Sequence, residues 1–194
     1  EFGRGSGHFL LLKGIIENVR ALDPDSEFKL LLPAQYEGRE LGVPRVEAVF
    51  PKEISHFQPT KAFTGLADFG EVVGAILLDP KRSLLDRLEM WSRQIADFRP
   101  HVIVADYAPT LLMCARGRWP TVHVGVGYTL PPPEAAQFPD FRPRRHEKIY
   151  SDEFLLESIN HALRAVSAKT LGHLPQMNQA DSYGLATIPL FDPY

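Results

Sequence analysis

Two kinds of apolar pattern alternate along the chain, and they predict helices and strands in turn. Helices are predicted where apolar residues recur three and four positions apart, or where a capping signal opens an apolar segment; they cover residues 7–22, 69–78, 79–98, 109–118 and 151–171. Short apolar runs predict strands over residues 28–32, 46–50, 102–105, 121–125 and 185–188. Because the strand runs are apolar on both faces and alternate with helices, we expect an α/β domain with a parallel sheet.

The first predicted helix carries the clearest apolar stripe. Its members, expected to be buried together, are Leu11, Leu12, Ile15, Val19 and Leu22. Asp23-Pro24 should end this helix, because proline cannot continue one. Asp79-Pro80 predicts a helix start, with an N-cap followed by proline at the first helical position. Residues 51–66 predict an irregular loop, and the proline-rich residues 131–143 predict no regular structure.

Composition limits the class of protein. The 194 residues, 44% of them hydrophobic, suit one large globular domain or two small ones. A formal net charge of −3 argues against a nucleic-acid-coating protein. The single cysteine, Cys114, lies in an apolar helical run and is interpreted as a buried structural thiol. With no internal disulfide, no membrane-length apolar stretch and no signal-like start, we expect a soluble, cytoplasmic protein.

One positive cluster interrupts this mild acidity. Its members are Arg142, Arg144, Arg145, His146 and Lys148. The cluster is interpreted first as a solvated loop and second as a contact for an anionic ligand.

A glycine-rich turn precedes the first predicted helix. Its sequence is Gly3-Arg4-Gly5-Ser6-Gly7-His8. Such glycines let the backbone approach a ligand, and the helix start adds unpaired N–H groups. The spacing matches neither a P-loop nor a dinucleotide fingerprint, and a purely structural turn is the alternative. Turns of this kind normally follow a strand, and just two residues, Glu1-Phe2, precede this one. We therefore expect the first strand of the sheet to be missing from this chain.

His8 and Asp106 are the candidate catalytic pair. His8 begins the first helix on the side of its apolar stripe, and Asp106 closes the buried run that starts near Val102. If both belong to one parallel sheet, they meet at the carboxyl edge, where ligands bind. A carboxylate-oriented histidine can take a proton from a hydroxyl group. The alternatives are a capped core histidine and a turn-capping aspartate. His123, in the middle of a strand, is interpreted as a satisfied core histidine, and Trp91 with Leu88 as core.

These segments, taken in order, resemble the N-terminal half of GT-B-fold, nucleotide-sugar-dependent glycosyltransferases, particularly bacterial relatives of the UDP-glucuronosyl/glucosyltransferase family. The matching stretches are residues 1–8, 98–110, 120–128 running into the prolines at 131–133, and 185–194. The resemblance covers most of the chain, and the glycine turn combined with Asp106-Tyr107-Ala108-Pro109 is its most specific part.

The resemblance implies a fold and a site. The fold would be a Rossmann-like parallel sheet flanked by helices, with residues 1–194 forming a single acceptor-binding domain. His8 would be the base and Asp106 would hold it. The acceptor would lie against Gly5, Ser6, Gly7, Tyr107 and Tyr128, although plain packing is an equal interpretation for Tyr128. Apolar and aromatic residues at 128–141 hint at a lipid-like, polyketide or aromatic alcohol.

The resemblance also implies a reaction. A sugar would pass from a nucleotide-sugar co-substrate to the acceptor hydroxyl with inversion, without metal or bound cofactor. The donor would bind mainly to a C-terminal domain that this chain lacks, so we expect no turnover from these 194 residues alone. Two other classes stay open: a non-catalytic Rossmann-like binding or scaffold domain, and a fragment of a nucleotide-sugar epimerase.

Overall fold

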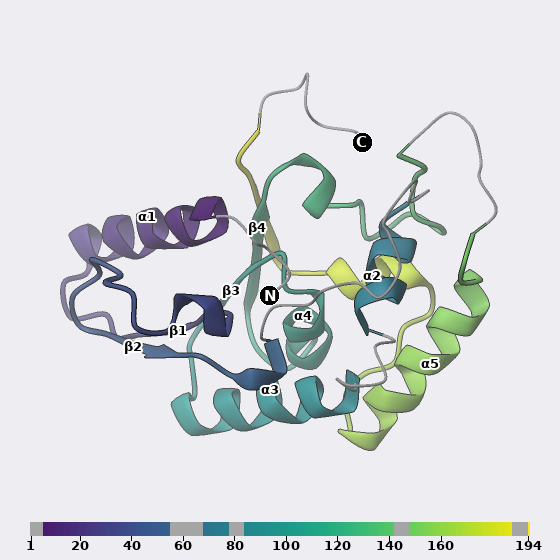
Figure 1. Cartoon of the computed structure of the whole chain (residues 1–194), viewed down its shortest axis with the longest axis horizontal. Coiled ribbons are helices and arrows are strands. Elements are labelled where there is room, and N and C mark those ends of the chain that lie inside the picture. Colours follow the sequence, from purple (N-terminus) through teal and green to yellow (C-terminus); the bar gives the residue numbers. More distant parts are fainter. Residues whose placement is uncertain (1–5, 55–67, 78–83, 142–147, 188–193) are drawn as a thin grey trace. The chain divides into compact units, whose positions relative to one another are not determined.

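The chain divides into two compact units, Glu1–Phe57 and Gln58–Tyr194. The computed structural model describes residues 6–54, 68–77, 84–141, 148–187 and 194 (Figure 1). None of the helices within these ranges is long and apolar enough to cross a membrane.

The first unit pairs two parallel strands with one long helix. Its elements are α1 (Ser6–Leu22), β1 (Phe28–Leu31), the 3-10 turn η1 (Ala34–Tyr36), β2 (Val46–Val49) and the 3-10 turn η2 (Lys52–Ile54). The strands run in register from Phe28 opposite Val46 to Leu31 opposite Val49. One buried hydrophobic cluster in this unit consists of Ile16, Leu30, Leu32 and Tyr36, and Ile54 is buried as well. The predicted first helix and first two strands are thus confirmed.

The predicted stripe on α1 is wrong at its C-terminal end. Val19 is 38% exposed and Leu22 89% exposed. The row that packs on the core is instead Phe9, Leu12 and Ile16, spaced three and four positions apart on one helical face. The rings of Phe9 and Tyr36 lie 5.7 Å apart. The aromatic contact at the start of the helix thus lies on the same face as Leu12 and Ile16.

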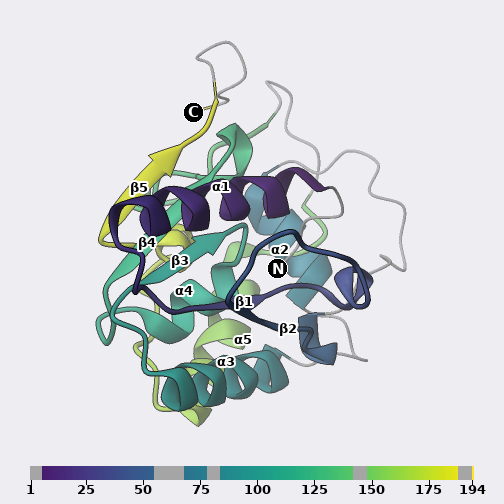
Figure 2. The same ribbon diagram turned by 90° about the vertical axis from the view of Figure 1, so that its left-hand side faces the viewer.

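The second unit holds a three-stranded parallel sheet with helices around it. Its elements are α2 (Phe69–Leu77), α3 (Leu84–Phe98), β3 (Ile103–Asp106), α4 (Pro109–Ala115), β4 (Thr121–Gly125), the 3-10 turn η3 (Gly127–Thr129), α5 (Asp152–Ala165), the 3-10 turn η4 (Leu174–Asn178) and β5 (Ser182–Leu185). The strand order is β3-β4-β5, and Figure 2 shows the three side by side. Helices α4 and α5 both pack on α3.

The buried interior of this unit matches several predictions. Leu88 is fully buried and Trp91 is 3% exposed, with the indole N–H of Trp91 donating to the Thr110 hydroxyl at 2.9 Å. Cys114 is fully buried, and burial raises the pKa of its thiol. Val102, predicted at the start of a buried strand, is half exposed, because the strand begins at Ile103.

Helix α5 ends at Ala165, six residues before the predicted end at Leu171. Ser167 adopts a left-handed backbone with φ of 55°, and the Ala168 N–H returns to the Leu163 carbonyl at 2.9 Å. This is the closing bond of a Schellman-type helix end. The Asn160 side chain then bonds both the N–H and the carbonyl of Leu171. Local capping therefore stops the helix although the apolar pattern continues.

The last strand starts three residues earlier than predicted, at Ser182 rather than Leu185. Asp181, the residue before β5, fixes the start of this strand against β4. Its carboxylate accepts hydrogen bonds from the backbone N–H and hydroxyl of Thr121 at 2.8 and 2.9 Å. The strand is largely exposed, so it lacks the apolar run by which buried strands are predicted.

The prediction of an α/β fold with parallel strands is confirmed as two small parallel sheets with helices. Residues 131–141 contain no helix or strand, as predicted. The glycine turn up to Gly5, the Asp79-Pro80 start signal and most of the 51–66 loop lie outside the described residues.

Candidate functional site

The carboxyl ends of β3 and β4 bring together an acid and two tyrosines. Asp106 is the last residue of β3, opposite Val124, and it is 5% exposed. Tyr107 follows directly, and Tyr128 lies in η3 just after β4. We call Asp106, Tyr107, Tyr128 and Phe141 the Asp106 edge. Parallel strands end at the same side of a sheet, which explains why residues 22 positions apart meet here.

Glycine at the end of β4 leaves room beside the carboxylate. A Cβ on Gly125 would collide with the Thr129 hydroxyl and lie 3.6 Å from Asp106 Oδ1. That hydroxyl donates to the Val126 carbonyl at 2.7 Å and accepts from the Val126 N–H at 3.1 Å. The chain can therefore turn sharply after β4 and carry Tyr128 back toward Asp106.

Tyr107 has an unusual backbone for a bulky residue. Its φ is 47°, in the left-handed region that costs an aromatic residue of order 1–3 kcal/mol. Its side chain is 7% exposed, with the Phe69 ring at 6.1 Å and the Tyr128 ring edge-on at 5.8 Å. Burial, followed by the neighbouring tyrosines, raises the pKa of Tyr107 far above its ordinary value. Strain of this kind concentrates at functional sites.

Tyr128 offers an accessible surface at the edge. It is 43% exposed, and the Phe141 ring stands edge-on to it at 6.4 Å. The Tyr194 hydroxyl donates to the Tyr128 carbonyl at 3.0 Å. Burial of its inner part and the charge of Asp106 raise the pKa of Tyr128, so the phenol stays protonated and able to donate at neutral pH. An exposed ring with a hydroxyl group can stack on an apolar molecule and hydrogen-bond it.

The predicted site residues fall into the two units. Asp106, Tyr107 and Tyr128 are brought together in the second unit. His8, Ser6 and Gly7 form the start of α1 in the first unit, and Gly5 lies outside the described residues. The pairing of His8 with Asp106 therefore stays a prediction. A Cβ on Gly7 would meet nothing within 4 Å, so packing alone does not require glycine there.

His123 is fully buried, as expected of a core histidine. One ring nitrogen, Nδ1, lies 3.3 Å from the Asn178 carbonyl oxygen. The other, Nε2, has no hydrogen-bond partner among the described residues, and neither has the buried amide of Asn178. Burial lowers the pKa of His123 to about 4, so the ring is neutral near pH 7. The histidine is buried as predicted but only half satisfied.

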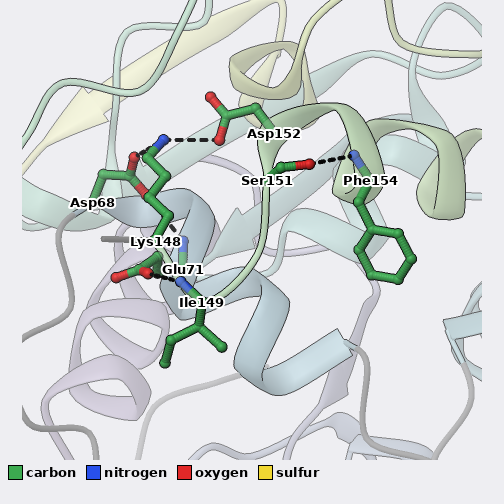
Figure 3. A network of polar contacts seen from close by, with 7 residues as sticks. All are labelled: Asp68, Glu71, Lys148, Ile149, Ser151, Asp152 and Phe154. Carbon is green, nitrogen blue, oxygen red and sulfur yellow. Dashed lines mark hydrogen bonds and ion pairs between the residues drawn. The ribbon is translucent and has the colours of Figure 1, made fainter. Parts of the chain in front are cut away.

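Lys148 has two acidic partners, which its position in a basic cluster did not suggest. Figure 3 shows its ammonium group between Asp68 and Asp152, at 2.6 and 2.8 Å. Partial burial disfavours the charge on Lys148, but the hydrogen bonds to Asp152 and Asp68 outweigh it and raise its pKa. The rest of the basic cluster, Arg142, Arg144, Arg145 and His146, lies outside the described residues. Asp68 carries no local motif, so its role could be found only from the three-dimensional structure.

Within the ranges that the structure describes, no three His, Cys, Asp or Glu side chains gather as a metal site. No protein family, curated protein or solved structure matches the chain.

Proposed function

We propose that this chain is the acceptor-binding half of an inverting, metal-independent glycosyltransferase that moves a sugar from a nucleotide-sugar to a hydroxyl acceptor. The observation that carries the proposal is the Asp106 edge. There a nearly buried carboxylate closes a parallel strand beside a half-exposed tyrosine, at the side of the sheet where α/β folds bind ligands. The resemblance to GT-B enzymes assigns the catalytic roles to residues at this edge and at the start of α1.

In the proposed reaction, His8 removes the proton of the acceptor hydroxyl as the oxygen attacks the anomeric carbon. A new carbon–oxygen bond forms while the bond to the nucleotide diphosphate breaks, and the diphosphate leaves with the electron pair. Attack from the opposite side inverts the configuration. Asp106 would orient the imidazole and stabilise the imidazolium ion formed on proton transfer. General base catalysis of this kind contributes about 10²–10⁴-fold to the rate.

The acceptor would rest on Tyr128, with Tyr107 fixing the angle of that ring. The resemblance also assigns acceptor contacts to Gly5, Ser6 and Gly7. The nucleotide-sugar would be held mainly by the C-terminal donor-binding domain that the family carries. A reducing, cytoplasmic setting is part of the proposal, since the single cysteine is a buried thiol.

The test is a transfer assay on the natural full-length polypeptide that contains these residues. UDP-glucose and dTDP-glucose serve as donors, with 1-naphthol and 1-decanol as acceptors. Products are identified by mass spectrometry, and their anomeric configuration by NMR. We expect an inverted product, and a loss of about 10²–10⁴-fold in kcat/KM for His8→Ala and Asp106→Asn.

Two exposed residues supply matched controls. His161→Ala on α5 and Asp97→Asn on α3 change the same residue types at exposed positions and should leave the rate unchanged. A product of retained configuration, or a His8→Ala variant as active as the wild type, would refute the proposal. Acceptor binding without transfer from any donor would favour a non-catalytic binding domain.

A further inference from the structure

The Asp106 edge is connected to a buried ion pair on the other side of Phe69. Asp68 directly precedes α2 and is fully buried. Its Oδ1 accepts from the Glu71 N–H at 3.0 Å, capping the helix, while its Oδ2 binds the Lys148 ammonium at 2.6 Å. The two carboxylate oxygens therefore differ in role, since one caps the helix and the other is neutralised by Lys148.

The same residues hold the start of α5 against α2. The Glu71 carboxylate accepts from the Ile149 N–H at 2.7 Å. Gly74 on α2 lies so close to the next segment that a Cβ would stand 2.7 Å from the Tyr150 ring. Lys148 also binds Asp152 in the first turn of α5. Figure 3 shows the polar contacts converging around Lys148 and Glu71. Helix α2 therefore has little freedom to shift against the segment that leads into α5.

From Asp68, two routes of contact lead to the Asp106 edge. The next residue, Phe69, packs on Tyr107 at 6.1 Å and on Phe138 at 5.2 Å. The backbone of Asp68 also pairs with Asp140 in an antiparallel bridge, which fixes the chain just before Phe141. Tyr107 and Phe141, whose rings both contact the Tyr128 ring, are therefore supported by Phe69, which follows Asp68, and by Asp140, which pairs with it.

We propose that Lys148 is a positioning residue for the ligand-binding face of the Asp106 edge, acting through its ion pair with Asp68. An unpaired buried carboxylate carries a large desolvation penalty. Without the lysine, Asp68 would move toward water and take Phe69 and the Asp140 bridge with it. Tyr107 and Phe141 would lose support, and the Tyr128 ring would lose its fixed orientation. The inference rests on the proposed function only in naming the acceptor as the molecule bound there.

The charge argument predicts an order among three variants. Lys148→Met leaves the buried carboxylate unpaired and should disturb the edge most. Asp68→Asn keeps an oxygen to cap α2 and leaves Lys148 with Asp152, so its effect should be small. The double variant has no unpaired buried charge and should return close to the wild type. If Lys148 acted simply by packing, the double variant would be no better than Lys148→Met.

The first measurement is independent of enzyme activity. The ionisation of Tyr128 is followed by NMR with ¹³C-labelled tyrosine, and its signal is assigned with Tyr128→Phe. Lys148→Met should let water reach the ring and bring the pKa of Tyr128 down toward that of free tyrosine, whereas the double variant should restore it. Lys169→Met, at an exposed position after α5, is the control and should titrate as the wild type.

The second measurement uses the transfer assay with 1-naphthol. Lys148→Met should raise the acceptor KM by about tenfold and change kcat by less than about twofold, because binding rather than bond-making is weakened. Absence of transfer in every protein, wild type included, would refute the proposed function and leave the tyrosine titration to decide on Lys148.

A Tyr128 titration that is the same in Lys148→Met as in the wild type would overturn the positioning role. Should Lys148→Met fail to fold, Lys148→Arg and the double variant decide. Wild-type titration in both supports the ion-pair role, and an altered titration in the folded double variant overturns it.

Discussion

Single residues in unusual surroundings give the most specific predictions. The first concerns His123, a buried histidine. Its pKa of about 4 in the folded chain lies below the ordinary value of 6.5 because burial disfavours the imidazolium. The unfolded chain therefore binds the proton more tightly. Above pH 6.5 the histidine is neutral in both the folded and the unfolded chain, and the folded state keeps its full stability. As the pH falls from 6.5 toward 4, protonation of His123 in the unfolded chain lowers the free energy of unfolding. A difference of this size corresponds to about 3 kcal/mol at most.

The measurement is urea unfolding at pH 7 and pH 4.5 for the wild type and His123→Leu. Both proteins lose stability from their carboxylates, but the variant should lose less, since it has no buried imidazole to protonate. An equal loss in the two proteins would mean that His123 is not the group responsible. Exposed His161→Leu should behave as the wild type.

Ser167 supports a prediction of opposite sign. Its φ of 55° lies in the left-handed region, where glycine carries no steric penalty. Ser167→Gly should therefore raise the free energy of unfolding by about 0.5–1 kcal/mol, measured by chemical denaturation. Ser158→Gly, inside α5, is the matched control and should lower it by about the same amount. A loss of stability at both positions would show that the helix does not end as described.

At the scale of an element, the segment after α5 depends on one side chain. Asn160 donates to the Leu171 carbonyl at 2.9 Å and accepts from its N–H at 2.7 Å, so a buried amide stands in for the helical bonds that end at Ala165. Asn160→Ala would leave two buried backbone groups unsatisfied and should cost about 2–4 kcal/mol of unfolding free energy. Exposed Glu157→Ala in the same helix should change it by less than about 0.5 kcal/mol. A similar small effect of Asn160→Ala would mean that water replaces the amide.

Some element boundaries could not be predicted from the local sequence. Helices α1 and α2 and strands β1 to β4 follow from local apolar patterns, although the pattern on α1 misplaces the C-terminal part of its buried face. The C-terminal end of α5 does not, since it depends on the left-handed backbone of Ser167 and on the hydrogen bonds of Asn160 to Leu171, eleven residues further along the chain. Strand β5 is equally hidden, because an exposed edge strand needs no apolar run.

At the scale of the whole molecule, some residues of the candidate site could likewise be predicted from local patterns and others could not. Asp106 stands out because it ends a buried run, and Tyr107 and Tyr128 follow from strands that end at one edge. The pairing of Lys148 with Asp68 joins positions 80 residues apart, and the local sequence around either residue does not predict the other as its partner. Long-range polar pairs of this kind depend on the packing of α2 against α5, which no local signal contains.

His8 and Asp106 pose the last question at this scale, because they belong to different compact units. A double-mutant cycle on stability tests their contact without any assay of activity. Residues that share a hydrogen bond show coupling of about 0.5–3 kcal/mol, whereas separated residues add within about 0.3–0.5 kcal/mol. If Asp106 holds His8, the effects of His8→Ala and Asp106→Asn should fall clearly short of adding in the double variant. The pair His161→Ala with Asp106→Asn should add. Additivity in the His8 pair would mean that Asp106 does not contact His8. The Asp106 edge would then lack the proposed base.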